Sequence, residues 1–583
     1  MADTSIIRLP FRPLSHYGSK GDIIGQGAYS EVYVTGQDYV IKVLKDVPPP
    51  ETDINGNPAD QIVIINHAII REVAVLVHLG SHPNIVPLVD VIVEKGCLAL
   101  VLRQAKSNLV NYLNLWQPSD LSFKAIVYQL IRGIAHVHQR NLIHRDIKSV
   151  NSLVYPGLDP NDFILRRLIA IADFGLSRPF GCPGTSMTGD MFTSYYRPPE
   201  ILLGSSTYNQ EADVWALGCT ILDLKHGEAF FSRPTDKGKT NEDLETLVLD
   251  RQFQFLGTPN EFVWPGVTEL PRWSNDFVVY PGERADTDPH KSFNTLINRM
   301  LTLDPARRPS AAQLLLDPYF KGVREEYEAQ YPESTPRQGL SCIDRLKIDQ
   351  KLVPRVDEGR WIPAVRLAQL WYRDQWILSL ETTGLILTIL NKILGLESQD
   401  RQYDVSYVAM AVMFGTSLGG GHWGHHQNIY SFYQGHGLTD DPETFKERGR
   451  QVVKELRFDL LMTTPQSYIE YWLKESADFD DEYDEMVYYL THEYYLSGGQ
   501  FDLDSWDVAL MLTNIARRVT QQPILHPEHV DGFIIKRARS FVEQLRRAGP
   551  NRSFPGMDMI LDHETIVATY QSNPLKLKSF NDR

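Results

Sequence analysis

The residues best suited to chemistry lie in two short segments of the first half of the chain. The segment "LIHRDIKSVN" (142–151) contains Asp146, which could accept a hydroxyl proton, and Lys148, which could neutralise negative charge. It ends in Asn151, and "IADFGLSR" (171–178) adds Asp173, so two oxygen ligands for a metal ion follow. Together these segments supply a base, a cation and a pair of metal ligands.

A glycine-rich segment, "GQGAYSEV" (25–32), lies nearer the N-terminus between two segments with strand character. Glycines allow main-chain N–H groups to approach phosphate oxygens, although glycine-rich hairpin turns are common and this segment alone is a weak signal. On the next predicted strand, "YVIKVLK" (39–45), Lys42 could reach phosphates. Glu72 lies on a predicted amphipathic helix over 67–79 and could pair with Lys42.

Taken in order, and followed by "YYRPPE" (195–200) and "DVWALGC" (213–219), these segments resemble a eukaryotic protein kinase. Three further segments resemble the cyclin-dependent kinases: "AIIREVAVLVHLGSHPNIVPLVDV" (68–91), "FLGTPNEFVWPGV" (255–267) and "MLTLDPARRPSAAQLLLDPYF" (300–320). The resemblance covers 18–321 and implies an α+β, bilobal kinase fold with a β-rich N-lobe and a helical C-lobe. It also implies transfer of the ATP γ-phosphate to Ser or Thr, with Mg2+ bound.

The resemblance implies a role for each matching residue. These are, for catalysis, Asp146, Lys148, Lys42 and Glu72; for ATP, Gly25, Gln26, Gly27, Ser30, Val32, Lys42, Arg103 and Ala105; for the metal ion, Asn151 and Asp173; for the activation segment, Thr188 with Arg71, Arg145 and Arg178; and for the substrate, Thr193 and Arg197. The three arginines would neutralise a phosphate on Thr188. Arg197 implies a preference for proline after the phosphorylated residue.

Several positions of the ATP-binding region depart from the family pattern. Ser30 replaces the third glycine of the phosphate loop, and Arg103 and Asn108 replace acidic residues of the segment that joins the lobes. Ser30 should not abolish ATP binding, and the other two predict altered inhibitor binding.

Composition excludes several classes of function. A net charge of −15 argues against a nucleic-acid or anionic-membrane binder. The four cysteines are far apart and form no metal-binding pair, which is typical of a reducing, intracellular compartment, nucleus or cytoplasm. The sequence predicts no membrane span and no signal peptide. Histidines in "GGGHWGHHQN" (419–428) are interpreted as part of a surface loop rather than a zinc site.

The chain continues well beyond the predicted kinase domain. Residues 322–360 are charged and interrupted by prolines, which predicts a linker. Helical periodicity follows at 362–380, 381–396, 404–418, 442–458, 465–475, 484–495, 503–519 and 529–548.

This C-terminal region resembles a cyclin. "DVSYVAMAVMFGTSL" (404–418) is similar to the central helix of a cyclin box, where Ala409, Ala411 and Gly415 would let helices approach closely. "FKERGRQVVKELRFDLLMTTPQSYIEYWL" (445–473) resembles the last helix of the box, with Thr464 and Pro465 opening the next helix. The resemblance implies an all-α region of one or two boxes, at 361–476 and 477–583. Ser417 and Gly449 replace the Lys and Glu with which cyclins contact kinases.

Three functional hypotheses follow. The first is a cyclin-dependent-type Ser/Thr kinase for Ser/Thr-Pro sites in proteins, activated in cis through an intramolecular interface with its own cyclin-like region. The second is a scaffold or kinase whose cyclin-like region binds other kinases or substrates in trans. The third is a kinase that still needs a separate cyclin, with the C-terminal region as a docking module.

Overall fold

The computed structural model describes Ile7 and residues 9–26, 30–36, 38–44, 67–94, 97–157, 167–179, 193–205, 208–282, 292–331, 363–365, 367–368, 380–396, 404–419, 429–461 and 505–519, with ten further single positions between 464 and 541. Chain contacts separate two compact units. The first comprises Met1–Val47, Ile65–Leu340 and Arg457–Asp459, and the second comprises Pro48–Ile64, Ser341–Leu456 and Leu460–Arg583.

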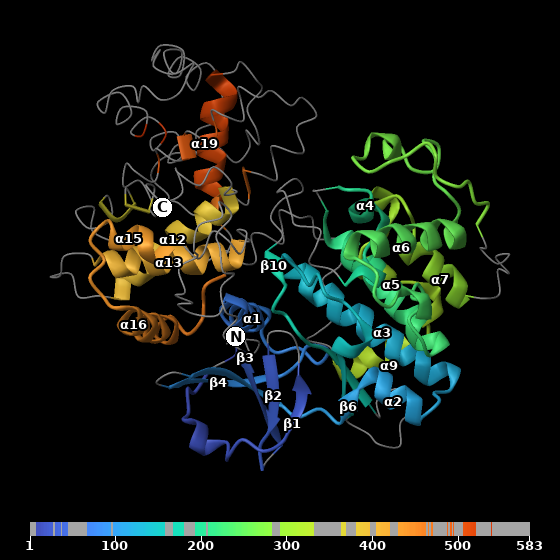
Figure 1. Cartoon of the computed structure of the whole chain (residues 1–583), viewed down its shortest axis with the longest axis horizontal. Helices are drawn as coiled ribbons and strands as arrows, with labels where there is room; N and C mark the ends of the chain where they lie inside the picture. Colours follow the sequence, from blue (N-terminus) through green and yellow to red (C-terminus); the bar gives the residue numbers. More distant parts are fainter. Residues whose placement is uncertain are drawn as a thin grey trace, which may run out of the picture. The chain divides into compact units, whose positions relative to one another are not determined.

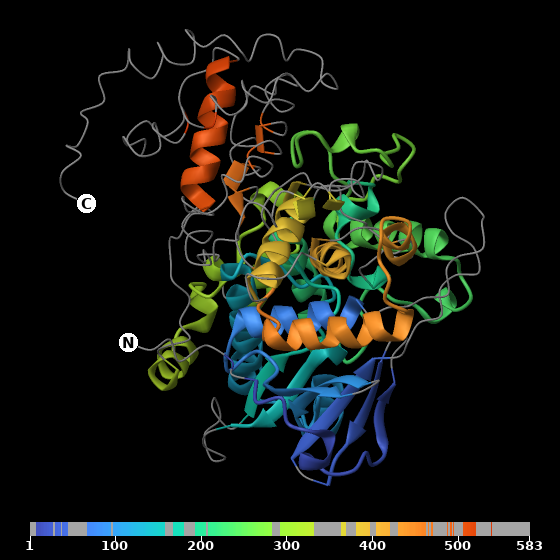
Figure 2. The same cartoon turned by 90° about the vertical axis from the view of Figure 1, so that its left-hand side faces the viewer.

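The first unit begins with a five-stranded antiparallel sheet in the order β1-β2-β3-β5-β4 (Figure 1). Its strands are β1 Ile23–Gln26, β2 Ser30–Val34, β3 Tyr39–Leu44, β4 Leu88–Glu94 and β5 Cys97–Arg103. Helix α1, His67–Leu79, has the predicted bounds and packs against β4 and β5 (Figure 2). Because β3 pairs with both β2 and β5, Lys42 lies inside the sheet, opposite Val32 and Leu100.

The segment before the sheet is bound to β4 through one buried carboxylate. Asp90 accepts hydrogen bonds from the Phe11 N–H at 2.8 Å, the Arg12 N–H at 2.9 Å and the Tyr17 hydroxyl at 2.7 Å. Tyr17 also joins the apolar cluster under the sheet. The folded unit therefore includes residues ahead of 18, where the predicted kinase domain begins.

The rest of the first unit is mainly helical. Its longer helices are α2 Leu109–Leu115, α3 Asp120–Gln139, α5 Gln210–His226, α6 Asn241–Leu256, α7 Ser292–Met300 and α9 Val323–Gln330. The shorter elements are α4 Pro199–Leu202, α8 Ala311–Leu314, and the 3-10 helices η1 Leu14–His16, η2 Ser149–Asn151, η4 Ser194–Tyr196, η5 Pro234–Asp236, η6 Val267–Glu269, η7 Pro305–Arg307 and η8 Pro318–Phe320. Short strands complete it: β6 Ser107–Asn108, β8 Ser152–Pro156 and β9 Arg167–Ile171 form one sheet, and β7 Leu142–Ile143 pairs with β10 Arg178–Pro179.

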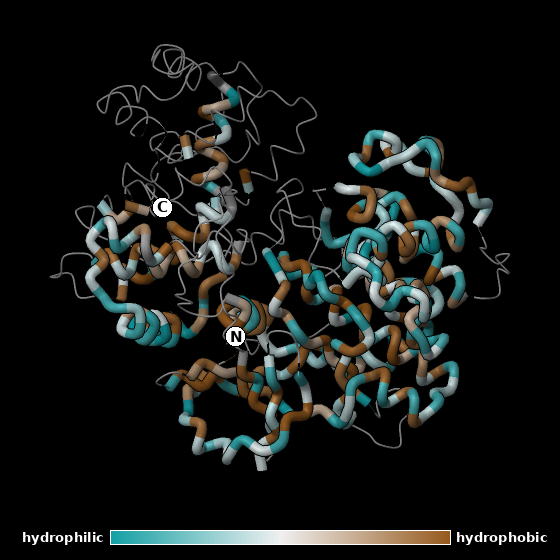
Figure 3. Tube along the Cα trace, viewed as in Figure 1, coloured by the Kyte–Doolittle hydropathy of each residue, from teal (hydrophilic) through white to brown (hydrophobic). Residues whose placement is uncertain are grey.

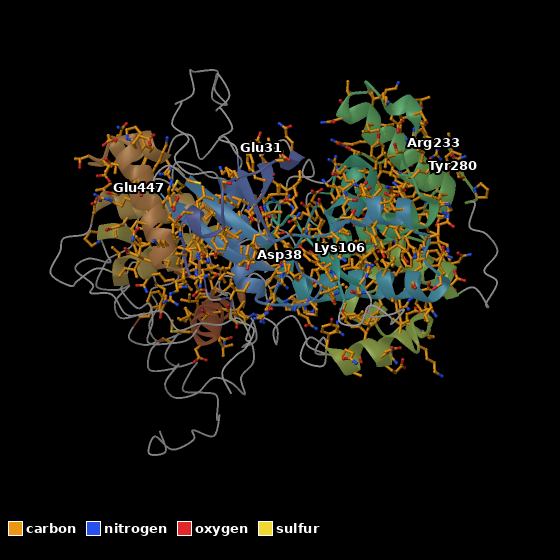
Figure 4. All side chains as sticks on the ribbon, turned by 90° about the horizontal axis from the view of Figure 1, so that it is seen from below. Glu31, Asp38, Lys106, Arg233, Tyr280 and Glu447 are labelled. Atoms are coloured by element: carbon orange, nitrogen blue, oxygen red, sulfur yellow. The ribbon has the colours of Figure 1, made fainter. Side chains whose placement is uncertain are left out.

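Local sequence accounts for the central helices. Ser119 caps α3 by accepting a hydrogen bond from the Ser122 N–H, and most of α3 is buried. Helix α5 ends at Gly227, whose φ of 82° favours glycine. Figure 4 shows Lys106 between the sheet, which carries Glu31, and the helical part, which carries Arg233 and Tyr280. The predicted α+β fold, with a β-sheet lobe and a helical lobe, is therefore confirmed for this unit.

The last helix of the first unit, α9, lies within the range predicted as linker. It forms because its apolar and aromatic residues have a partner surface on α3, and Tyr327 is only 1% exposed. The remainder of the predicted linker, from 332 onward, lies outside the described residues.

The described helices of the second unit are α12 Leu380–Leu396, α13 Val405–Gly419, α15 Ile429–Gln434, α16 Pro442–Glu455 and α19 Ser505–Val519. Helices α12 and α13 are in close contact, because a Cβ added at Gly415 would lie 2.8 Å from the Ile386 Cα. Figure 3 shows α16 as largely hydrophilic, unlike the apolar α13. None of the described helices combines the length and apolar character needed to cross a membrane.

The predicted helices at 381–396, 404–418 and 503–519 agree with α12, α13 and α19 within two residues. The helix predicted over 442–458 ends early, at Glu455, because Arg457 and Phe458 adopt left-handed φ values of 53° and 56°. Helix α15 was not predicted. The predicted helices at 362–380, 465–475, 484–495 and 529–548, and the histidine loop at 420–428, lie wholly or mostly outside the described residues.

Candidate active site

A buried ion-pair network joins the sheet, α1 and the segment after β9. The Lys42 Nζ lies 2.8 Å from both carboxylate oxygens of Glu72 and 2.9 Å from the Asp173 Oδ1. Lys42 and Glu72 are both buried, so each needs the opposite charge of the other. The predicted pairing of Lys42 with Glu72 is thus present, and Asp173 shares the same ammonium group.

Electrostatics keep Lys42 and Asp173 charged, whereas burial raises the pKa of Glu72 above its ordinary value despite the nearby Lys42. Burial by itself lowers the pKa of Lys42, but the negative charges of Glu72 and Asp173 outweigh it and raise the Lys42 pKa above its ordinary value. Burial would raise the pKa of Asp173, but the Lys42 ammonium holds it below its ordinary value. At neutral pH the site therefore presents an ammonium group beside an ionised carboxylate.

A second cluster surrounds Asp146 in the loop after β7. The Lys148 Nζ donates to the Asp146 Oδ2 at 2.7 Å, and the Asn151 Nδ2 donates to the same oxygen at 3.1 Å. The Thr193 hydroxyl donates to the Asp146 Oδ1 at 3.0 Å and lies 3.4 Å from the Lys148 Nζ. Two predicted residues of the same segment, Lys148 and Asn151, and the distant Thr193 therefore meet at the Asp146 carboxylate.

The conformation of this loop depends on Asp213 of α5, a residue for which the local sequence predicts no role. Its buried carboxylate accepts hydrogen bonds from the His144 N–H at 2.8 Å and the Arg145 N–H at 2.9 Å. Arg145 has a φ of 70°, a conformation that is unfavourable for a non-glycine residue and needs support from its surroundings. A signal was present in the sequence, because an acid in the apolar run "DVWALGC" must have polar partners if that run is buried.

The predicted phosphate loop is described on both of its strands. Gly25 and Gln26 of β1 pair with Val32 and Glu31 of β2, and Ser30 begins β2. Gly27 lies outside the described residues.

The segment that joins the two lobes is bonded to β8 at two points. The Tyr155 hydroxyl donates to the Arg103 carbonyl at 3.1 Å, and the Lys106 N–H donates to the Val154 carbonyl, so Ala105 lies between two anchored positions. Asn108, at a position where the family carries an acid, caps α2 by accepting from the Asn111 N–H at 2.8 Å.

Three predicted arginines are buried near the segment that follows Asp173. Arg71 donates to the Gly175 carbonyl at 2.9 Å, Arg145 donates to the Tyr208 hydroxyl at 2.9 Å, and Arg178 lies on β10. Burial, assisted by the charge of Arg145, lowers the pKa of Arg71 to about 10. Mutually repelling cations of this kind would be stabilised by an anion. Thr188 lies outside the described residues.

Arg197, in the segment that follows Thr193, is held by α6. It forms a buried ion pair with Glu245 of α6, and the Gln252 Nε2 donates to its carbonyl at 2.9 Å. Three residues later, Glu200 forms a two-pronged ion pair with Arg308 at 2.9 and 3.0 Å. The segment 193–200 is therefore held rigidly beside Asp146.

Comparison with known proteins decides the family. The protein kinase domain family matches residues 19–320, more than half of the chain. The chain belongs to the protein kinase family. This kinase also resembles a chain in a solved structure of the CAK complex from Chaetomium thermophilum bound to ATP-gamma-S, with 28% identity, a TM-score of 0.43, and coverage of 53% of this chain and 92% of that chain.

The match confirms the predicted protein kinase, and family membership implies that it uses ATP, typically with Mg2+. The residues present fit such a metal ion, because the Asp173 side chain is ionised and remains 46% exposed beside Lys42. Within the described part of the chain no cluster of three or more His, Cys, Asp or Glu side chains could hold a metal by itself. Asn151 and Asp173, together with the phosphates, would supply the ligands.

Proposed function

We propose that this kinase transfers the γ-phosphoryl group of ATP to Ser or Thr hydroxyls that precede proline, and that its C-terminal helical unit activates it in cis. The observation that carries the first part is the position of the Thr193 hydroxyl. It donates to Asp146 and lies beside the Lys148 ammonium group, as an aliphatic hydroxyl about to be phosphorylated would.

The chemistry assigns one task to each group. The substrate oxygen attacks the γ-phosphorus, the bond between that phosphorus and its bridging oxygen breaks, and ADP leaves. Asp146 accepts the hydroxyl proton, and Lys148 stabilises the charge that develops on the transferred group. Lys42, held by Glu72 and Asp173, orients the phosphates. Bound Mg2+ would neutralise charge on the phosphates through Asn151 and Asp173.

The preference for proline rests on Arg197. Its guanidinium group is buried against Glu245, and its carbonyl is bonded to Gln252. Arg197 lies four residues after Thr193 and is fixed by these bonds. A fixed surface here favours a proline in the substrate, because the proline backbone is already restricted. The absence of an N–H in proline also means that no substrate donor is left without a partner.

The proposal of activation in cis rests on the second unit and on chain connectivity. Its apolar helix α13 packs closely on α12 at Gly415, as the resemblance to a cyclin box implies. The part of the predicted linker that follows α9 would give the two units an effective concentration on the order of millimolar, so even a weak interface would stay occupied. Activation would then consist of holding Glu72 against Lys42.

The deciding experiment measures phosphate transfer from Mg·ATP to Ser-Pro, Ser-Ala and Tyr-Pro peptides. We would compare the full chain, its Asp146→Asn variant and a chain that ends at Leu340. We expect activity on the Ser-Pro peptide alone, loss with Asp146→Asn, and restoration of the shortened chain when residues 341–583 are added separately.

Equal activity of the full and shortened chains would refute activation in cis. Equal use of the Ser-Pro and Ser-Ala peptides would refute the proline preference, and transfer to tyrosine would refute the Ser/Thr assignment.

A further inference from the structure

The loop between α1 and β4 contains an asparagine whose side chain is completely buried. The Asn84 Nδ2 donates to the Ile169 carbonyl at 2.8 Å, and its second hydrogen faces the Tyr327 hydroxyl at 3.0 Å and the Gln129 Oε1 at 3.3 Å. The Tyr327 hydroxyl lies 3.2 Å from the Asn84 Oδ1 as well. Three separate elements, β9, α3 and α9, therefore meet at this one amide.

The main chain of this loop is bound to β9 as well. The Ile171 N–H donates to the Asn84 carbonyl at 3.0 Å, and the Val86 N–H donates to the Ile171 carbonyl at 2.9 Å. Ile171 is the last residue of β9, two residues before Asp173. Asn84 lies five residues after the end of α1, the helix that carries Glu72. The loop thus links the helix of Glu72 to the strand that leads to Asp173.

Helix α9 is anchored so that Tyr327 reaches this loop. The Arg132 guanidinium group of α3 lies 4.9 Å from the centre of the Tyr327 ring and donates to the Tyr331 carbonyl at 3.1 Å. The Tyr128 hydroxyl of α3 donates to the Glu328 Oε1 at 2.9 Å. Because the Arg132 contacts fix the ring and the end of α9, the Tyr327 hydroxyl is held in place at Asn84.

We infer that Tyr327 is a positioning residue for the kinase reaction, because its hydroxyl completes the bonding of Asn84 and so keeps Glu72 and Asp173 in register around Lys42. The inference rests on the phosphoryl-transfer activity proposed above. It assigns a role in catalysis to a helix beyond the region that the family match covers, which ends at residue 320. Residues at the start of the predicted linker would then act on the active site through the first unit alone.

The chain offers a matched control for the test. Tyr327→Phe and Tyr128→Phe each remove one hydroxyl from the packing of α9 on α3, and both rings remain in their T-shaped contact. Only the first hydroxyl touches Asn84. A purely structural role predicts similar losses from both variants, whereas a positioning role predicts a difference in turnover.

Both variants would be made in the full chain. Turnover and the KM for ATP would be measured with saturating peptide, and hydrogen exchange would be measured at the Val86 and Ile171 amides. We expect Tyr327→Phe to lower kcat by about three- to tenfold and to speed exchange at both amides. We expect Tyr128→Phe to leave kcat within about twofold of wild type and exchange at these amides unchanged.

Equal losses of kcat in the two variants, or an unchanged kcat in Tyr327→Phe, would overturn the inference. If the wild-type chain transferred no phosphate, the proposed function would fail, and the exchange comparison would still decide whether Tyr327 holds the loop. A double-mutant cycle with Asn84→Ala adds a further criterion. The two substitutions should be clearly less than additive in kcat, and additive effects would also overturn the inference.

Discussion

Substitution of Asp213 by asparagine should lower the activity by distorting the loop that carries Asp146, although Asp213 touches none of the reacting groups. The Asp213 carboxylate accepts the main-chain N–H groups of His144 and Arg145 on different oxygens. An asparagine has only one acceptor oxygen, so one of these N–H groups would face an amide donor. The left-handed conformation of Arg145, at a φ of 70°, would lose part of its support, and Asp146 follows directly.

The magnitude follows from the bonds that are lost. A buried N–H without an acceptor costs about 1–3 kcal/mol, and replacing a charged acceptor by a neutral one costs about 1 kcal/mol more. The total, about 2–4 kcal/mol, corresponds to about a 30- to 900-fold loss of kcat/KM if all of it appears at the reaction step. Some of it will appear as lower stability instead, so we expect a loss of at least about tenfold.

The assay is steady-state phosphate transfer by the full chain, accompanied by thermal unfolding. Asp317→Asn provides the control, because this buried acid also accepts a main-chain N–H, that of Tyr319 at 2.9 Å, and pairs with Arg299. It touches no residue of the catalytic loop. A loss of less than about threefold in Asp213→Asn, or an equal loss in both variants, would refute the reasoning.

Two further predictions concern the buried carboxylate of Asp223 in α5 and the packing of helices α12 and α13 in the second unit. The Asp223 carboxylate accepts a hydrogen bond from the Tyr196 hydroxyl at 2.7 Å, and burial raises its pKa to about 6. The stabilisation of the folded state by this protonated acid is therefore complete below about pH 4 and is lost as the pH rises through 6. We expect the wild-type chain to become more stable between pH 7 and pH 5 relative to Asp223→Asn, in thermal unfolding, and parallel pH profiles would contradict this. At Gly415, an added methyl group would lie 2.8 Å from the Ile386 Cα, so Gly415→Ala should destabilise the second unit by about 1–3 kcal/mol despite the better helix propensity of alanine. Thermal unfolding of the full chain measures the effect, and an unchanged or higher transition temperature would show that α12 and α13 are not in close contact.

The order of short motifs predicted most of the candidate active site. Lys42, Asp146, Asn151 and Asp173 were each predicted from a local pattern, because the chemistry demands a particular residue type at a particular distance along the chain. Helical periodicity likewise predicted α1 and α13, since an amphipathic or apolar helix shows its buried face in the spacing of its residues. Neither required knowledge of which segments meet in space.

Only the tertiary structure decided which distant side chains support that site. Asp213 is 68 residues from Arg145, Asp90 is 79 residues from Phe11, and Tyr327 is 243 residues from Asn84. Local sequence names the partner of none of them, and even at Asp213 the surrounding apolar run indicates only that the acid needs polar partners if the run is buried. Burial makes the hydrogen bonds of each group important, because a buried polar group without a partner costs about 1–3 kcal/mol. Local spacing specifies what a residue can do, whereas long-range packing decides which residue must hold it in place.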